Sequence, residues 1–290
     1  MKNITIGTDT EVFLVNTQTG KVTSAEGIIG GSKEEPLNIT SLGEGFALQE
    51  DNVMAEFNIP ATNDNEEFKS NIDKILNHIN TNYTNFKALI VPSANFNPID
   101  LLTEQANKFG CDPDFDAYLM QQNFPPDPIM FPDIRFAGGH VHIGLLDKLG
   151  VKSIDFIQDN PLQTVNPEIL HVLGNVVKFM DLFVGLPSTI LDEDDQRKNV
   201  YGTPGRFRLK PYGVEYRSLS NYWIKDGYLI DMVLNGTKKA VEHAFNHDTL
   251  IYHDEFFQEV NSLMKNNKKQ NIIQFLNELN ITVPTSEKVK

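Results

Sequence analysis

Four short segments of the chain alternate between apolar side chains and side chains that are ionisable or carry an amide. Because side chains two positions apart on a β-strand point to the same face, each segment predicts a strand with one apolar and one polar face. The polar pairs are, in chain order, Asp9 and Glu11, Glu56 and Asn58, His140 and His142, and Glu215 and Arg217. A chain with this pattern is expected to build a sheet whose two faces differ in chemistry.

Apolar residues at helical spacing predict several helices. Their spacing indicates amphipathic helices over about 65–82 and 166–186. A further helix is expected between Pro98 and Gly110, since proline favours the first helical turn and glycine ends helices. Beyond about residue 225 the chain is expected to be mainly helical.

Strands and loops fill much of the remaining sequence. A loop or lid rich in Pro and Asp is expected over 111–133, and a strand over 135–145. A charged turn at 192–198 and a Gly/Pro loop precede another strand at 213–219. Strands and helices do not alternate strictly, so an α+β fold with an antiparallel or mixed sheet is favoured over a doubly wound one. We expect a single domain over residues 1–290.

The composition excludes several classes of protein. Acidic side chains outnumber basic ones by 39 to 25, which gives a formal charge of −14 and argues against nucleic acid as the main partner. A single cysteine, Cys111, excludes an intramolecular disulfide framework and a cysteine-based zinc cluster. No stretch reaches the roughly 20 apolar residues that span a bilayer, and no signal segment is evident at the N-terminus. We therefore expect a cytoplasmic protein without a membrane partner.

The polar faces of the four predicted strands indicate a metal site. The alternative for any single strand is an ordinary face in water, but such a face usually carries Lys, Thr and Ser rather than Asp, Glu, His, Asn and Arg. Carboxylates gathered on one concave face repel one another, and a bound divalent cation removes this conflict. Oxygen ligands with one or two imidazoles suit Mg²⁺ or Mn²⁺, and histidine-rich sets also hold Zn²⁺. Glycines around His140 and His142 indicate a close approach of a ligand or of another backbone.

A cluster of basic residues predicts an anion site. Four cations occur within twelve residues of this acidic chain, namely Arg206, Arg208, Lys210 and Arg217. They form either surface pairs with the preceding acidic turn, worth only about 0–1 kcal/mol each, or a clamp for phosphate or carboxylate. In the glycine-rich loop over 27–45, Lys33 is a further candidate for an anion contact, although Ser32 interrupts the order of a P-loop. Metal ligands beside arginines are typical of phosphoryl transfer.

Several short motifs resemble those of the phage-type carboxylate–amine ligases, also called type 2 amidoligases. They lie in order between about residues 7 and 224 and comprise Gly7–Glu11, Gly30–Lys33, Gln49–Asn58, Gly110–Asp114, Gly138–Gly144 and Tyr212–Asn221. This family is assigned to the glutamine synthetase-like fold. The resemblance therefore implies a curved, mostly antiparallel sheet with helices packed on its outer face.

The resemblance also implies roles for the residues at matching positions. The divalent metal ligands would be Asp9, Glu11, Glu56, His140 and Glu215. Arg206 and Arg208 would hold the phosphates of ATP, and we add Lys210 and Lys33 as cofactor-binding candidates from the basic cluster and the glycine-rich loop. The catalytic candidates are His142 on the substrate side, Arg217 at the transferred phosphate, and Asp51, which pairs with Glu56 and is the first choice for accepting the proton of the amine.

Together these features predict an ATP-dependent ligase that uses Mg²⁺ or Mn²⁺ and joins a carboxylate to an amine through an acyl phosphate. The substrates would be small molecules or peptides, and the location would be the host cytoplasm if a phage encodes the chain. Two alternatives remain open. One is a metal-dependent hydrolase that uses His140, His142 and Glu215 around one Zn²⁺ or Fe²⁺. The other is a structural relative that has lost activity.

Overall fold

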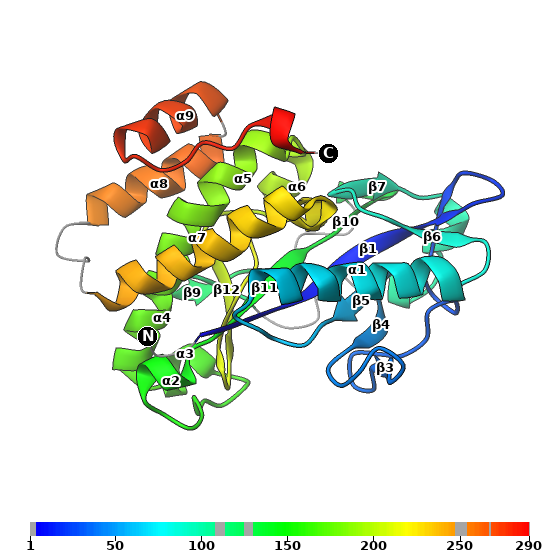
Figure 1. The fold of residues 1–290 in the computed structure, drawn as a ribbon, viewed down its shortest axis with the longest axis horizontal. Coiled ribbons are helices and arrows are strands. Elements are labelled where there is room, and N and C mark those ends of the chain that lie inside the picture. Colours follow the sequence, from blue (N-terminus) through cyan, green and yellow to red (C-terminus); the bar gives the residue numbers. More distant parts are fainter. Residues whose placement is uncertain (1–3, 108–113, 125–129, 247–253, 267, 290) are drawn as a thin grey trace.

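A computed structural model describes residues 4–107, 114–124, 130–246, 254–266 and 268–289. In these residues the chain forms an α+β structure around one large sheet (Figure 1), as expected. The sheet has eleven strands in the described part of the chain, and all its named pairs of strands run antiparallel. A separate pair joins β7 (Ser93–Asn95) to β10 (Ile134–Phe136).

The order of the strands places the long first strand near the middle of the sheet. The main path runs through β3 (Leu37–Asn38), β4 (Ala47–Asp51), β5 (Met54–Asn58), β1 (Thr5–Asn16), β11 (Gly139–Gly144), β13 (Gly213–Tyr216), β12 (Arg206–Lys210), β8 (Phe115–Asp116) and β9 (Gln121–Gln122). Two further strands, β2 (Val22–Thr23) and β6 (Phe86–Leu89), pair with β1 off this path. Segments far apart in sequence therefore become neighbours.

The register of these strands places the polar side chains next to one another. Asp9 lies opposite His140, and Glu11 lies opposite Glu56. In the next pairing along the sheet, His142 lies opposite Glu215. Directly opposite residues of antiparallel strands share one face, so the period-2 pattern of the sequence becomes a single polar face.

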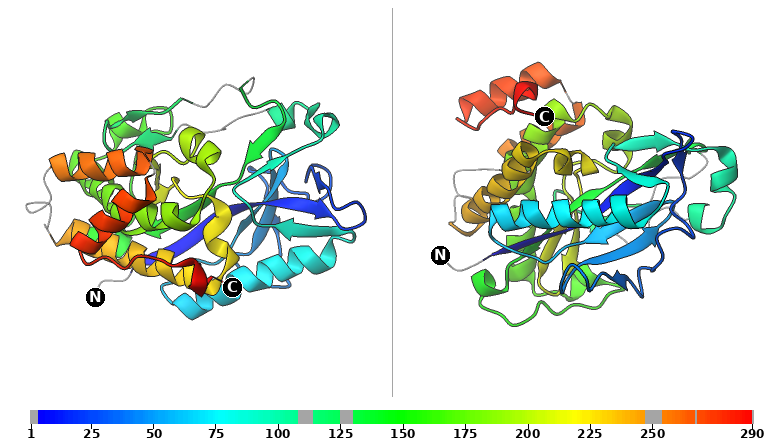
Figure 2. Two further views of the ribbon diagram at one scale, coloured as in Figure 1. Left: turned by 90° about the horizontal axis from the view of Figure 1, so that it is seen from above. Right: turned by 45° about the vertical axis from the view of Figure 1, so that its right-hand side comes forward.

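Helices cover the other face of the sheet. The apolar side chains of β1, among them Ile6, Val12 and Leu14, share one buried cluster with Phe68 and Ile72 of α1. The helices are α1 (Asn65–Asn82), α2 (Leu146–Leu149), α3 (Pro161–Thr164), α4 (Pro167–Met180), α5 (Leu186–Leu191), α6 (Asp195–Val200), α7 (Gly227–Phe245), α8 (Asp254–Asn266) and α9 (Lys269–Glu278). Figure 2 shows α4, α7, α8 and α9 gathered toward one end of the molecule and α1 toward the other.

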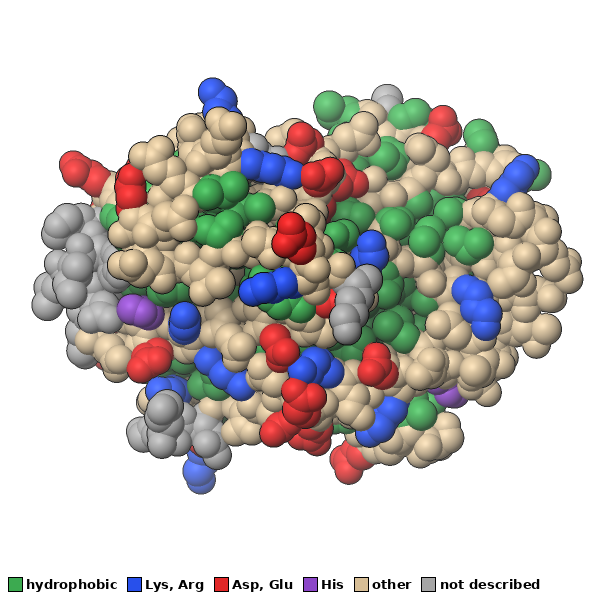
Figure 3. All heavy atoms as spheres, turned by 45° about the horizontal axis from the view of Figure 1, so that its top comes forward, with side chains coloured by type: hydrophobic (Ala, Val, Ile, Leu, Met, Phe, Trp, Pro, Cys, Tyr) green, Lys and Arg blue, Asp and Glu red, His purple; other side chains and the backbone are tan. Residues whose placement is uncertain are grey.

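A π-helical segment, Asp181–Gly185, joins α4 to α5 without a break. The combined run, Pro167–Leu191, is long and apolar enough to cross a membrane by composition. Most of it is buried inside the structure, where it packs against α7, so it fits the central helix of a globular core. On the face shown in Figure 3, basic side chains are interspersed with acidic ones rather than gathered in a patch.

Several local expectations were wrong. Two short 3-10 helices, Pro98–Leu101 and Gln105–Asn107, replace the helix expected before Gly110. The side chain of Asn107 donates hydrogen bonds to the carbonyl oxygens of Leu101 and Thr103, which are therefore not available to a continuous helix. Residues 108–110 lie outside the described residues.

The strand expected over 135–145 is divided between the two sheets, because the peptide that links Ala137 to Gly138 hydrogen-bonds to the side chains of Arg197 and Glu11. The charged turn is largely helix α6, and the Gly/Pro loop contains strand β12. The described residues of the expected lid are 114–124 and 130–133, while 111–113 and 125–129 lie outside the described residues. Within 114–124, the short strands β8 and β9 extend the sheet.

Two helical glycines give a matched test of this packing. A methyl group at Gly236 of α7 would lie 2.6 Å from the carbonyl oxygen of Phe183, whereas one at Gly174 of α4 would meet only Met120 Sδ, at 3.6 Å. Gly236→Ala is expected to lower the free energy of unfolding by about 1–3 kcal/mol through overpacking. Gly174→Ala should leave it unchanged or raise it by up to about 1 kcal/mol through helix propensity. Urea unfolding measures both, and equal effects of the two substitutions would contradict the packing described here.

Candidate active site

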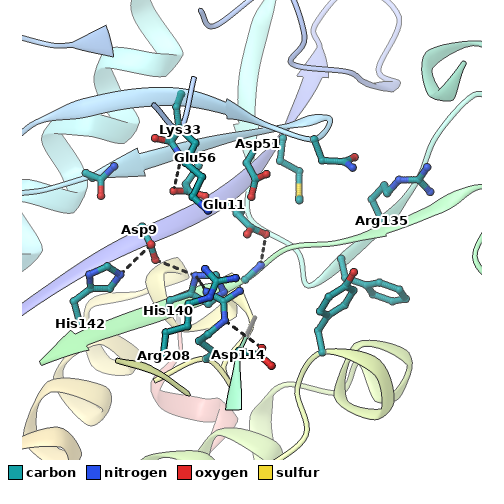
Figure 4. A pocket seen from close by; sticks show the side chains of 18 of the residues that line it. Asp9, Glu11, Lys33, Asp51, Glu56, Asp114, Arg135, His140, His142 and Arg208 are labelled. Carbon is teal, nitrogen blue, oxygen red and sulfur yellow. Dashed lines mark hydrogen bonds and ion pairs between the residues drawn. The ribbon is translucent and has the colours of Figure 1, made fainter. Parts of the chain in front are cut away.

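The polar face of the sheet forms the floor of a basin (Figure 4). Strands β1, β4, β5, β11 and β12 supply most of the floor, and the loop around Lys33 closes one side. The ionisable side chains that line it, among the described residues, are Asp9, Glu11, Asp51, Glu56, Asp114, Lys33, Arg135, Arg197, Arg208, Lys210, Arg217, His140, His142 and Tyr201. Glu215 lies below this surface and is fully buried.

The first group of ligand atoms in the basin comes from three adjacent strands. Single ligand atoms of Asp9, His140 and Glu215 all lie within 4.8 Å of one another. His140 Nδ1 is 3.0 Å from Asp9 Oδ1 and 3.6 Å from Glu215 Oε1. Two carboxylates and one imidazole at this spacing are a set that one divalent cation can share.

The second group consists of carboxylates alone. Glu11, Asp51 and Glu56 also offer one oxygen each within 4.8 Å of one another. Asp51 reaches this group because β4 turns into β5 over two residues, the first of which, Asn52, adopts the left-handed conformation with φ of 55°. An all-oxygen set of this kind suits Mg²⁺ or Mn²⁺.

Hydrogen bonds aim the carboxylates of the second group. Gln49 Nε2 donates to Glu56 Oε1 at 2.9 Å, and the backbone N–H of Gly138 donates to Glu11 Oε2 at 2.6 Å. Gln49 was not among the predicted site residues, although it begins the Gln49–Asn58 motif, because an amide two residues before Asp51 is ordinary in a strand. Its function becomes visible only once β4 and β5 are paired.

Burial and mutual repulsion raise the pKa values of this second group. Burial first and the Asp51 carboxylate second raise the pKa of Glu11 to about 8. Burial, followed by Asp9 and Asp51, raises the pKa of Glu56 well above its usual value. A positive charge placed beside these two carboxyls would favour their ionised forms, which is the behaviour of a set that fits a divalent cation.

The first group is already balanced by cations of the chain. Burial raises the pKa of Asp9, but the neighbouring His142 and His140 more than offset it and hold that pKa well below its usual value. Burial likewise raises the pKa of Glu215, but Arg217, Lys210 and His142 together outweigh it and lower that pKa. Burial, with Arg217, lowers the pKa of His140 to about 4, so its imidazole is neutral at pH 7, the form that binds metals.

His142 lies beside the first group but outside it. Its Nε2 is 3.0 Å from Asp9 Oδ2, and its Nδ1 contacts the hydroxyl of Tyr212. Burial lowers the pKa of His142, but Asp9 raises it by more, so the net shift is upward. The hydrolase alternative required His140, His142 and Glu215 around one ion. The described residues place Asp9, rather than His142, with the other two.

The basic cluster divides into two parts. Arg208, Lys210 and Arg217 line the basin and surround Glu215, with Lys210 Nζ 2.8 Å from Glu215 Oε2. Arg206 differs from the expectation, because it does not line the basin. Its guanidinium donates to both carboxylate oxygens of Asp114, at 3.0 and 2.9 Å, and to the carbonyl oxygen of Val200.

Asp114 and Arg197 also line the basin, although neither was a predicted site residue and Asp114 was noted only as the end of the Gly110–Asp114 motif. Asp114 lines the basin, holds Arg206 and lies 3.4 Å from Arg217 Nε, so it spaces the two arginines. Arg197 belongs to α6, in the segment expected to be a turn, and its side chain reaches the basin wall. Only the tertiary structure brings these residues to the strands.

The raised pKa of Glu11 predicts how stability depends on pH when divalent cations are removed. A carboxyl whose pKa is raised on folding stabilises the fold below its ordinary pKa and loses that contribution as pH rises through about 8. With EDTA present, the free energy of unfolding should therefore fall as the pH rises from about 5 to 8 and level off above that. In Glu11→Gln this slope should be smaller by up to about 1.4 kcal/mol per pH unit. Urea unfolding at several pH values measures it, and parallel slopes in the two proteins would contradict the assignment.

A comparison with protein families places the chain among known proteins. Residues 169–284 match the model of the phage phiEco32-like COOH·NH2 ligase-type 2 family. The matched segment includes strands β12 and β13 with their basic residues, whereas β1 and β11 precede it. No curated protein and no solved structure matches the chain. Over this segment, which is less than half of the chain, the protein is similar to the phage-type carboxylate–amine ligases of type 2, and this similarity supports the resemblance drawn from the motifs.

Proposed function

We propose that the protein is an ATP-dependent ligase that joins a carboxylate to an amine through an acyl phosphate. One observation carries the proposal: two groups of metal-ligand atoms share a single basin with three cations that face a fully buried glutamate. The family name supports the joining of carboxylate and amine. The need for ATP and for divalent cations is our inference from the chemistry of the basin.

Each group of ligands would hold one divalent cation. Asp9, His140 and Glu215 would form the first site, and Glu11, Glu56 and Asp51 the second. Mg²⁺ or Mn²⁺ bound there would neutralise the charge of a triphosphate and orient it. In this proposal Asp51 is a metal ligand rather than the base that deprotonates the amine, since its ligand oxygen falls within the second group.

The basic side chains would complete the binding of the phosphates. Arg208, Lys210 and Arg217 project from β12 and the end of β13 toward the first group. Lys33 lies on the opposite side of the basin, above Glu56 (Figure 4), and would reach the same triphosphate from there. Cations on both sides would stabilise the charge that spreads over the γ-phosphoryl group during transfer.

The reaction would proceed in two steps. A carboxylate oxygen of the first substrate attacks the γ-phosphorus of ATP, the bond to the bridging oxygen breaks, and ADP leaves with that electron pair. The amine nitrogen of the second substrate then attacks the acyl carbon, phosphate leaves, and the nitrogen gives up a proton. We propose that both substrates are small molecules or peptides, and that they enter the half of the basin near Tyr201 and Met54.

Removal of the central carboxylate tests this function. Purified protein with ATP, Mg²⁺, hydroxylamine and a mixture of amino acids and short peptides should release phosphate and form hydroxamates. Glu215→Gln should reduce both by about 100-fold or more, because it removes the negative charge that Arg208, Lys210 and Arg217 share, and one ligand of the first site.

The matched control is Glu66→Gln, which changes an exposed glutamate at the start of α1 and should retain full activity. Phosphate release that persists in Glu215→Gln would refute the site. Wild-type protein that releases phosphate from no ATP-containing mixture, while a tightly bound Zn²⁺ or Fe²⁺ supports hydrolysis, would favour the hydrolase.

A further inference from the structure

We propose that Arg197 is a positioning residue: it fixes the orientation of the Ala137–Gly138 peptide, and that peptide aims Glu11 at the second cation. This inference rests on the proposed two-cation basin and assigns a part of it that lies on a different element, α6. It concerns neither a contact with substrate nor a contact with the metal itself.

The side chain of Arg197 joins two stretches of backbone. It is only 2% exposed. Its Nε donates to the carbonyl oxygen of Ala137 at 2.7 Å, and its two terminal nitrogens donate to the carbonyl oxygens of Ser218 and Leu219 at 3.1 and 2.5 Å. The guanidinium fork thus spans from the break before β11 to the chain just after Arg217.

The contact with Ala137 determines where the next N–H points. The carbonyl of Ala137 and the N–H of Gly138 belong to one planar trans peptide, so they point in opposite directions. With the carbonyl held by Arg197, the N–H is directed at Glu11 Oε2, which it meets at 2.6 Å. If this peptide turned over, its carbonyl oxygen would face the carboxylate of Glu11 and repel it.

Among the described residues, both polar groups of this peptide bond to side chains, the carbonyl to Arg197 and the N–H to Glu11. The Ala137–Gly138 peptide lies between β10 and β11, where the backbone passes from one sheet to the other. Glycine at 138 gives the backbone freedom to turn there. A Cβ atom at this position would lie 2.4 Å from His140 Nε2, so a larger residue that restricts the backbone does not fit here.

Arg197 also ties this peptide to the strand that carries Glu215. The carbonyl oxygen of Leu219 accepts from Arg197 and from the N–H of Gly139, at 3.1 Å, so both stretches meet at one atom. The charge of the guanidinium acts in the same direction, since it favours the ionised form of Glu11. Residues that orient metal ligands in this way commonly change metal affinity by about 10–100-fold when they are replaced.

A purely structural role makes a different prediction from a positioning role. If Arg197 only stabilises the fold, its loss weakens both cation groups together. If it positions Glu11, its loss weakens the carboxylate group of Glu11, Asp51 and Glu56 and spares the group that contains His140. The two sites can be told apart, because Mn²⁺ coupled to a histidine nitrogen gives a signal in pulsed EPR that an all-oxygen site does not.

The experiment is a Mn²⁺ titration of full-length protein by calorimetry and pulsed EPR. Wild type should bind two Mn²⁺, one of them coupled to nitrogen. Arg197→Met should retain the nitrogen-coupled Mn²⁺ and bind the other about 10–100-fold more weakly. Arg197→Lys keeps the positive charge and one hydrogen-bond donor, so its affinity for this second Mn²⁺ should fall by a smaller factor. Lys198→Met is the matched control: this neighbour on α6 also donates to backbone carbonyls, of Thr189 and Asp192, but does not line the basin, and it should bind both ions normally.

Three results would overturn the proposal. Folded Arg197→Met that binds two Mn²⁺ with unchanged affinity would show that the peptide needs no such support. Equal weakening of both ions in a variant with wild-type circular dichroism would leave only a structural role. If Arg197→Met does not fold, Arg197→Lys decides between the same outcomes. Wild type that binds no Mn²⁺ would instead refute the cation sites of the proposed function, and the inference with them.

Discussion

Buried carboxylates that face one another are the constraint on which this structure depends. Glu11, Glu56 and Glu215 are each less than a tenth exposed, and they lie on one face of the sheet, on strands β1, β5 and β13. Removing such groups from water costs several kcal/mol each unless positive charge compensates them. The chain supplies that charge at Glu215 through Arg217 and Lys210 but leaves Glu11 and Glu56 with raised pKa values. The positive charge that the chain does not supply near Glu11 and Glu56 is the physical reason to expect a bound cation beside them.

Both the strand pairing and the helices on the opposite face of the sheet hold the buried carboxylates in place. The register of the antiparallel pairs determines which ligand residues lie opposite one another on adjacent strands. The apolar face of the same strands packs against α1 and against the packed pair of helices α4 and α7. From behind, Asp181 in the π-helical segment accepts a hydrogen bond from the hydroxyl of Tyr216, at 2.6 Å, next to Glu215. Irregular helical turns of this type often occur at functional sites. Here the segment anchors the strand that carries the central glutamate.

The sequence predicted which side chains share the basin more reliably than it predicted what each one contacts. The period of two along a strand is a local property, so the shared face of Asp9 and Glu11, and that of His140 and His142, could be predicted without a fold. The partner of Arg206 could not, because Asp114 lies 92 residues away and joins it only when β8 pairs with β12. Strand β12 itself was hidden by its short length and by the glycines and prolines that precede it.

Arg197 shows the same limit most clearly. In sequence it is one of several charged residues in an acidic stretch, and composition alone favoured a solvated turn. In the structure that stretch is largely helix α6. The arginine is buried there because its guanidinium donates hydrogen bonds to three backbone carbonyl oxygens. When a buried arginine donates to backbone carbonyl oxygens that are distant in sequence, the residues next to it in the chain do not reveal that it is buried.

Anomalous diffraction tests the central claim most directly. Crystals grown with Mn²⁺ and a non-hydrolysable ATP analogue would be measured near the manganese absorption edge. The account predicts two anomalous peaks in one basin, one among Asp9, His140 and Glu215 and one among Glu11, Asp51 and Glu56, with the triphosphate between them and the cations of β12. Manganese bound elsewhere on the molecule, or a triphosphate bound away from both groups, would contradict it.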